Sequence, residues 1–391
     1  MSPTIQNLRN DFLIDPKVIF LNHGSFGATP IPVFESYQRW QRELEKQPVE
    51  FLGRRATDLL ANARQILASY LGTKRDNLVF VMNATVGLNT VARSLKLSND
   101  DEVLSSDHEY GAIDRTWRFL SQKDGFKYIN HAISLPVTTP NDFVNSFWKS
   151  VTPKTRVIFL SQITSPTAMI FPVHEICIKA RSEGILTVID GAHAPGQIDL
   201  SLDKLGADFY SGNLHKWLCA PKGSGFLYAR PEVQHLIEPL VVSWGWESEN
   251  PGPSRFVDYQ EWTGTRDISA FLAVPDAVCY QEQHHWDQVK TYCHALASDA
   301  RRRITTITGM EPFYPDSETW YAQMGSAPLP ANLDINFLKS RLYDDYNIEI
   351  PVIKWNGHNI LRYSFQAYNT MEDVSALESA LTQLLSDTKV Y

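Results

Sequence analysis

Short apolar runs alternate with segments of helical spacing along most of this chain. The runs that predict strands cover residues 78–82, 102–104, 156–160, 185–189 and 225–229. Apolar residues recur with helical spacing over residues 33–45, 56–71, 87–95 and 173–183. Strands that alternate with helices typically form a mostly parallel sheet with helices on both faces. The sequence therefore predicts an α/β fold around one central sheet.

The end of the chain has a different pattern. After Thr265 come longer helical segments, then the proline-rich residues 311–330, a strand candidate at 360–365 and a closing helix at 371–385. We therefore expect a large domain and a smaller C-terminal α+β domain, joined by an N-terminal segment. The expected ranges are residues 15–269 for the large domain, 270–391 for the small domain and 1–14 for the segment.

The composition is typical of a soluble globular protein. Of the 391 residues, 43% are hydrophobic and 20% are charged, and 36 basic against 44 acidic residues give a net charge of -8. An acidic chain without blocks of like charge does not attract nucleic acid, so we expect none as a partner. No apolar run has the length of about 18 residues that a membrane helix needs, and no signal peptide is evident, so we expect a cytosolic location. The four cysteines lack C-x-x-C spacing and are expected to be reduced.

Two reactive residues follow predicted strands. Asp190 comes directly after the apolar run 185–189, and Lys216 lies on the loop that follows residues 207–210. Ligands bind outside the carboxyl ends of the strands in open α/β sheets, so both side chains are expected to face one pocket. An acid and an amine placed in this way indicate a site for pyridoxal phosphate (PLP).

PLP needs these two groups for different reasons. A buried carboxylate such as that of Asp190 keeps the ring nitrogen protonated, while Lys216 holds the aldehyde covalently. A partly buried lysine has a lowered pKa, which suits Lys216 to remove the α proton of a substrate. Taken singly, Asp190 is more typical of a loop cap and Lys216 of a surface lysine. The joint pattern favours catalysis.

Several further motifs occur in a specific order along nearly the whole chain. They are residues 20–27 (FLNHGSFG), 83–89 (NATVGLN), 107–112 (DHEYGA), 262–265 (WTGT) and 361–364 (LRYS), in addition to the segments around Asp190 and Lys216. Together they resemble the class V aminotransferase family of fold-type I PLP enzymes. Within that family they are most similar to the isopenicillin N epimerase-like and cysteine desulfurase-like branch. The resemblance implies the fold-type I architecture, PLP as cofactor and an amino-acid-like substrate.

The resemblance also implies which residues bind PLP. Ala84 and Thr85 begin a helix, whose free N–H groups and dipole attract the phosphate, with the Thr85 hydroxyl adding a hydrogen bond. Ser211 and His215 are expected to add phosphate contacts, and His193 matches a position near the ring oxygen. Plain helix capping by Thr85 and a purely structural His193 are the alternatives.

Other matched residues concern the ring face and the substrate. The family alignment places Tyr110, in preference to His108, over the PLP ring, where stacking contributes about 1 kcal/mol beyond burial. Many relatives have histidine at this position, so tyrosine is a departure. Arg362 matches the arginine that binds the α-carboxylate with two parallel hydrogen bonds, and its alternative is an ion pair between domains. His23 and Trp244 are further candidates for substrate binding.

The resemblance implies a homodimer with shared active sites. In the family's dimers a Gly-Thr pair reaches the phosphate of the neighbouring subunit, and Gly264 and Thr265 match this pair. Arg54 and Arg55 are candidates for a second substrate carboxylate across the dimer, with exposure to water as the alternative. No metal site is expected, because the histidines at 284–285 lack ligand spacing.

Two reactions remain open. Cysteine desulfurases of this family need a cysteine on a mobile loop, and the matching residues 350–358 contain none. Epimerisation at the α carbon needs a second proton donor opposite Lys216, for which His23 and Tyr110 are candidates. Elimination from a cysteine-like or cystine-like substrate, a C–S lyase reaction, needs only Lys216 and a leaving sulfur. A non-catalytic PLP-fold binding protein is a third hypothesis, which the intact catalytic residues disfavour.

Overall fold

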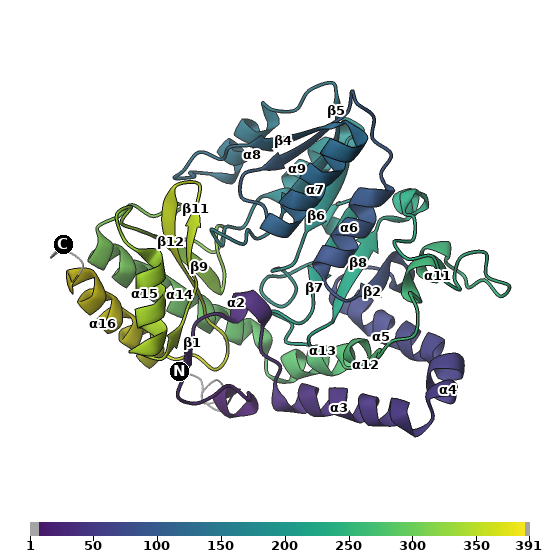
Figure 1. Ribbon diagram of the computed structural model, residues 1–391, viewed down its shortest axis with the longest axis horizontal. Coiled ribbons are helices and arrows are strands. Elements are labelled where there is room, and N and C mark those ends of the chain that lie inside the picture. Colours follow the sequence, from purple (N-terminus) through teal and green to yellow (C-terminus); the bar gives the residue numbers. More distant parts are fainter. Residues whose placement is uncertain (1–7, 388–391) are drawn as a thin grey trace.

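The computed structural model describes residues 8–387, and its core is a seven-stranded sheet (Figure 1). The strand order is β2-β8-β7-β6-β5-β3-β4, and each neighbouring pair is parallel except those that β8 forms with β2 and β7. The predicted mostly parallel sheet is therefore confirmed. Its strands are β2 (Leu78–Val81), β3 (Glu102–Ser106), β4 (Lys127–His131), β5 (Thr155–Ser161), β6 (Leu186–Asp190), β7 (Phe209–Asn213) and β8 (Gly225–Ala229).

Alternate side chains of the sheet pack into two cores, one on each face. On β5, Val157 and Phe159 join one cluster while Ile158 and Leu160 join the other, and all four are fully buried. Helices α6, α7 and α11 contribute apolar residues to the first cluster, and helices α5, α8 and α9 contribute to the second. This alternation explains why the strand reads as a continuous apolar run in the sequence.

Several of the helices begin at recognisable signals. Asn83 caps α6, because its Oδ1 accepts from the N–H of Val86, and the hydroxyl of Thr139 caps α8 in the same way. Within residues 8–387, every helix is too short or too polar to traverse a lipid bilayer. The helices up to residue 283 are α2 (His23–Phe26), α3 (Ile31–Lys46), α4 (Pro48–Glu50), α5 (Ala56–Tyr70), α6 (Ala84–Ser94), α7 (Gly111–Asp124), α8 (Pro140–Trp148), α9 (Val173–Ser182), α10 (Leu202–Leu205), α11 (Arg255–Glu261), α12 (Ser269–Leu272) and α13 (Val274–Gln283).

A second sheet lies in the C-terminal part of the chain, drawn in yellow and green in Figure 1. It is antiparallel with the order β11-β12-β9. Its elements and the helices beside it are β9 (Met324–Leu329), β11 (Val352–Trp355), β12 (His358–Ser364), α14 (Trp286–Thr308), α15 (Ile335–Asp344) and α16 (Met371–Asp387). A mostly parallel sheet with a smaller C-terminal α+β part is the predicted fold class, which is confirmed.

Strands β4 and β9 are among those that lie where the sequence pattern predicts none. β9 falls inside the proline-rich residues 311–330, and its Pro328 stands opposite Ile360 of β12. β9 is an edge strand, and proline is tolerated there because its missing N–H is not needed by a neighbour. β4 is also an edge strand, with lysine, asparagine and histidine along its length. Edge strands need no continuous apolar run, so composition did not reveal them.

The residues before α3 connect the two parts of the chain. β1 (Ile19–Phe20) pairs in parallel with β10 (Ile348–Glu349). In addition, the N–H of Ser364 donates to the carbonyl O of Leu21 at 2.9 Å. The beginning of the range proposed for the large domain thus packs on the C-terminal part, and the domain bounds remain a proposal. The described structure leaves out residues 1–7 and 388–391 of the proposed ranges.

Two isoleucines of helix α9 differ in exposure and can show which face of the helix packs on the sheet. Ile176 is fully buried and Ile178 is 56% exposed on this helix. Ile176→Ala is expected to lower the free energy of unfolding by about 2–5 kcal/mol, because it removes buried methyl groups and leaves a cavity. Ile178→Ala should change it by less than about 0.5 kcal/mol. Urea denaturation of both variants measures the difference, and equal effects would contradict the packing.

Candidate active site

The carboxyl ends of five strands meet around one cavity of about 250 Å³. Ser25 and Phe26 line it from the N-terminal segment. The other lining residues end or follow β2, β3, β5, β6 and β7, and they are Asn83, Ala84, Thr85, Tyr110, Ser161, Ile163, Ser165, Asp190, Ala192, His193, Asn213, His215 and Lys216. A larger cavity of about 910 Å³ lies at the amino-terminal edge of the sheet and contains none of the predicted site residues. The predicted chemistry therefore coincides with the smaller cavity.

Asp190 is the last residue of β6 and is almost completely buried. Its Oδ1 accepts a hydrogen bond of 2.8 Å from the N–H of Ala192. Burial raises the pKa of Asp190 to about 6, against the lowering effects of that N–H and of the Lys216 amine. A cationic N–H partner strongly stabilises the charged form of a carboxylate that burial has removed from water.

Lys216 lines the same cavity from the loop that follows β7. Burial lowers the pKa of Lys216 to about 7, with Arg362 adding to the effect and Asp190 opposing it. The indole N–H of Trp217 donates to Nδ1 of His193 at 3.2 Å, so the neutral imidazole carries its proton on Nε2. Nε2 of His193 lies 3.2 Å from Nζ of Lys216 and donates to it. This hydrogen bond requires an uncharged amine.

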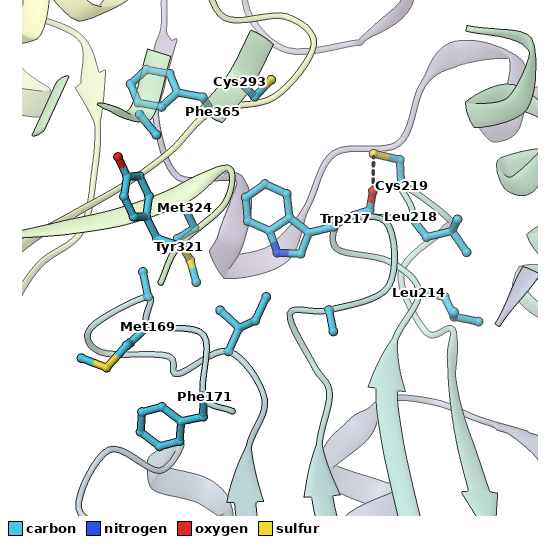
Figure 2. Close-up of a cluster of buried hydrophobic side chains, with 14 of the residues drawn as sticks. Met169, Phe171, Leu214, Trp217, Leu218, Cys219, Cys293, Tyr321, Met324 and Phe365 are labelled. Carbon is cyan, nitrogen blue, oxygen red and sulfur yellow. Dashed lines mark hydrogen bonds between the residues drawn. The ribbon is translucent and has the colours of Figure 1, made fainter. Parts of the chain in front are cut away.

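Packing holds the loop that carries Lys216. The ring of Trp217 is fully buried, and Figure 2 shows it in a cluster of apolar side chains with Met324 and Phe365 of the C-terminal part. On the other side, Gly27 has a φ of 69° and approaches the loop closely. A Cβ at that position would lie 2.0 Å from the carbonyl O of His215, so a glycine is required.

His23 lies beneath this loop and does not line the cavity. Its Nε2 donates to the carbonyl O of Lys216 at 3.0 Å, and its Nδ1 accepts from the hydroxyl of Tyr368 at 2.9 Å. Complete burial lowers the pKa of His23 to about 3, so the ring stays neutral. The predicted substrate-binding position of His23 is therefore not what the structure shows, because the ring supports the backbone of the lysine loop.

Helix α6 points its amino end at the cavity. The N–H of Ala84 donates to Oδ1 of Asn213 at 2.8 Å, and the N–H of Val86 donates to Oδ1 of Asn83 at 3.0 Å. Thr85 lies between these two bonded groups and lines the cavity. The N–H groups of a first helical turn have no partner within the helix and carry the positive end of its dipole. This end of the cavity therefore suits an anion such as a phosphate.

Of the two residues predicted to add phosphate contacts, His215 lines the cavity and Ser211 does not. Nδ1 of His215 donates to the carbonyl O of Ser224 at 3.0 Å, and burial lowers the pKa of His215 to about 4. The hydroxyl of Ser211 donates to the carbonyl O of Phe226 at 2.7 Å inside the sheet. Asn213, which the sequence analysis missed, reaches the cavity instead. Its signal is a polar residue at the carboxyl end of a buried strand, the same signal that marks Asp190.

Tyr110 and His108 occupy different environments. Tyr110 lines the cavity at the beginning of α7 and is half-exposed. His108 is fully buried, with Nδ1 2.8 Å from Oδ1 of Asp107 and its ring 4.2 Å from the ring of Trp355. Of these two aromatic rings, Tyr110 is the one positioned to face a ligand, and its stacking on PLP stays a prediction.

Arg362 reaches the edge of the cavity from β12. Its Nη1 donates to the carbonyl O of Ser165 at 2.6 Å, and its Nη2 donates to the hydroxyl of Ser25 at 3.1 Å. Both serines line the cavity. Burial lowers the pKa of Arg362 to about 10, so the guanidinium remains a cation at neutral pH. A substrate carboxylate matches such a planar pair of N–H donors.

Thr265 and Trp244 line a different cavity, of about 520 Å³. Trp244 is 84% exposed, and Leu52 and Gly53 contribute to the same cavity. Arg55 forms ion pairs with glutamates of its own segment. Within one chain the structure does not bring Thr265 and Trp244 to Lys216, so their predicted roles depend on a second copy of the chain.

Comparisons with known proteins find relatives that match over nearly the whole chain. The isopenicillin N epimerase of Amycolatopsis lactamdurans is 35% identical over 390 residues, covering 97% of this chain and 98% of that protein. The probable chloroplastic L-cysteine desulfhydrase of Arabidopsis thaliana is 26% identical, covering 95% and 84%. The apo structure of a cysteine desulfurase from Thermococcus onnurineus NA1 has the same fold, with a TM-score of 0.82, 21% identity, and coverage of 97% and 98%.

The family model of class V aminotransferases matches residues 27–377, which is most of the chain. The epimerase relative matches over almost the full length of both proteins, so the likeness is not confined to one motif. The chain belongs to the class V aminotransferase family, whose members are PLP-dependent enzymes.

Proposed function

We propose that this protein binds PLP between Asp190 and Lys216 and epimerises the α carbon of an amino acid or a peptide-like amine. The observation that carries the proposal is that a buried carboxyl group and an amine with a lowered pKa line one cavity, beside the amino end of a helix. The epimerase relative, at 35% identity over nearly the whole chain, supports this choice of reaction. The cytosolic location expected from the composition is part of the same proposal.

The residues of the cavity fit the parts of PLP. In this proposal Asp190 keeps the ring nitrogen protonated, and Thr85 with His215 binds the phosphate at the amino end of α6. His193 lies near the ring oxygen, and Tyr110 stacks on the ring. When bound, PLP supplies the electron sink that weakens the bonds of the substrate's α carbon.

Three residues act on the substrate itself. Lys216, with a pKa of about 7, is available at neutral pH to take the α proton, and Arg362 binds the α-carboxylate. Epimerisation also needs a proton donor on the opposite face of the α carbon. Tyr110 lines the cavity whereas His23 lies beneath the lysine loop, so we assign the second donor to Tyr110.

Elimination from a cysteine-like or cystine-like substrate is the second candidate. The desulfhydrase relative favours it, and the reaction needs no second proton donor. Transfer of sulfur to the protein is not expected, because residues 350–358 contain no cysteine. Cys219, three residues after Lys216, is fully buried, and burial raises its pKa to about 12. A thiol of that kind is not a nucleophile at neutral pH.

We also propose a homodimer in which each subunit completes the site of the other. Thr265 would reach the phosphate of the neighbouring subunit, and Trp244 would border the neighbouring substrate pocket. Val242 is 67% exposed close to Trp244, and exposed apolar side chains gathered on one loop are typical of an interface. A single chain leaves Thr265 in a separate cavity, which supports an arrangement with two copies.

Lys216 can attach PLP only as an uncharged amine. The rate at which the apoprotein incorporates PLP is expected to rise with pH and to level off above the Lys216 pKa of about 7, far below the ordinary lysine value of 10.5. Stopped-flow recording of the visible absorbance measures this profile, and Lys216→Ala should develop no such absorbance. A rate that still rises about tenfold per pH unit well above neutrality would contradict the lowered pKa.

The two reactions leave different products. In deuterated water, an epimerase introduces deuterium at the α carbon and forms no keto acid, whereas a lyase acting on cysteine or cystine releases pyruvate. We expect the first result. Tyr110→Phe keeps the aromatic ring and should lower epimerisation by roughly 100-fold or more, because it removes the proton donor. Release of pyruvate, without deuterium exchange in amino acids and small peptides, would favour elimination. As a control, Lys216→Ala should abolish both epimerisation and elimination.

The shared site can be tested at Thr265. Thr265→Ala is expected to weaken PLP binding about tenfold, because one hydrogen bond to a charged phosphate contributes about 1.5 kcal/mol. Thr263→Ala, an exposed neighbour outside the cavity of Thr265, should leave the affinity unchanged. Equilibrium dialysis measures the affinities and sedimentation the oligomeric state. A monomer in which Thr265→Ala binds PLP like the wild type would refute the shared site.

A further inference from the structure

Glu109 is a buried acid to which the proposed function assigns no role. It lies between β3 and α7, directly before Tyr110, and is 8% exposed. Its Oε1 accepts a hydrogen bond of 2.6 Å from the hydroxyl of Ser106. Its Oε2 accepts from both the N–H, at 2.8 Å, and the hydroxyl, at 2.7 Å, of Ser161. Three donors therefore hold the carboxyl group in one orientation.

Ser161 connects Glu109 to Asp190. Ser161 ends β5 and Asp190 ends β6, and the two residues are register partners in the parallel ladder. The N–H of Gln162 donates to the carbonyl O of Asp190 at 2.8 Å, and Ser161 lines the cavity. The carboxyl end of β5 is thus bonded to the side chain of one buried acid and to the backbone of the other.

The surroundings of Glu109 couple its charge to that of Asp190. Ser106 on β3 and Ser161 on β5 donate hydrogen bonds to Glu109, and Tyr128 on β4 and Asp190 on β6 interact with it electrostatically. Within residues 8–387 no cation forms an ion pair with Glu109. Burial raises the pKa of Glu109 to about 8, and the charge of Asp190 adds to this effect. When one of two buried acids ionises, the other binds its proton more tightly.

We propose that Glu109 is a positioning residue for the ring nitrogen of PLP: it holds the end of β5 beside Asp190 and, when ionised, strengthens the binding of the ring-nitrogen proton at that carboxylate. This inference rests on the proposed role of Asp190. A purely structural glutamate would support the loop before Tyr110 but would not affect the ring nitrogen. The positioning role and the purely structural role predict different titrations of the PLP ring nitrogen.

Nitrogen NMR of the holoenzyme, loaded with PLP that is isotopically labelled at the ring nitrogen, shows directly whether this nitrogen carries a proton. Glu109→Gln keeps the shape and removes the charge. With this variant the ring nitrogen should lose its proton at a pH lower by about half a unit or more, a threefold change in proton affinity. The matched control is Glu102→Gln, at the other end of β3, where a buried glutamate accepts from the hydroxyl of Thr152 at 2.5 Å. Its titration should match the wild type, and equal curves for all three proteins would overturn the proposal.

Ser161→Ala provides a second variant that does not depend on the folding of Glu109→Gln. It removes the hydroxyl donor at 2.7 Å and keeps the N–H, so Glu109 ionises less readily and the ring nitrogen should again lose its proton at lower pH. An unchanged titration in this variant would also overturn the inference. Asp190→Asn separates the two proposals: if it leaves the ring-nitrogen signal unchanged, the proposed role of Asp190 is wrong. If it alone changes the signal, only the inference about Glu109 fails.

Discussion

A lysine amine with a lowered pKa in the same cavity as a buried carboxyl group is the constraint on which the site depends. Asp190 is buried and Lys216 partly so, and burial moves their two pKa values toward neutrality from opposite sides. The structure keeps the amine in place through one neutral hydrogen bond from His193, whose tautomer is set by the indole N–H of Trp217. A cofactor with an aldehyde at one end and a basic nitrogen at the other satisfies both groups at once.

The parallel sheet makes this concentration of polar groups possible. Parallel strands all end at the same edge of the sheet. Acidic and amide side chains and the amino ends of helices can gather at that edge without entering the apolar cores on either face of the sheet. β5, β6 and β7 place Ser161, Asp190 and Asn213 at neighbouring positions of that edge. Each of these three strands is buried over most of its length and ends in a polar residue, so the same strands stabilise the sheet and build the site.

That pattern also sets the limit of what could be predicted from the sequence. Asp190 and Lys216 were predicted correctly to share a cavity because each follows a recognisable strand. Ser211 and His23 were placed in the site by nearness to motifs, but nearness along the chain does not say which side of a loop a residue faces. Ser211 lies two residues before the end of β7, where its hydroxyl donates to the carbonyl O of Phe226. The packing of His23 under the lysine loop depends on a contact with Tyr368, far away in the sequence. The proposed roles of Thr265 and Trp244 depend on a second copy of the chain, so the packing of one copy does not test them.

The short segment that begins at β1 has a mechanical consequence for the lysine. Its Leu21 is bonded to Ser364 of the C-terminal sheet, and two residues later His23 is bonded to the carbonyl O of Lys216. The C-terminal sheet and the main chain of the reactive lysine are therefore anchored to the same three-residue segment. The position of the amine thus depends on how the outer part of the molecule is packed.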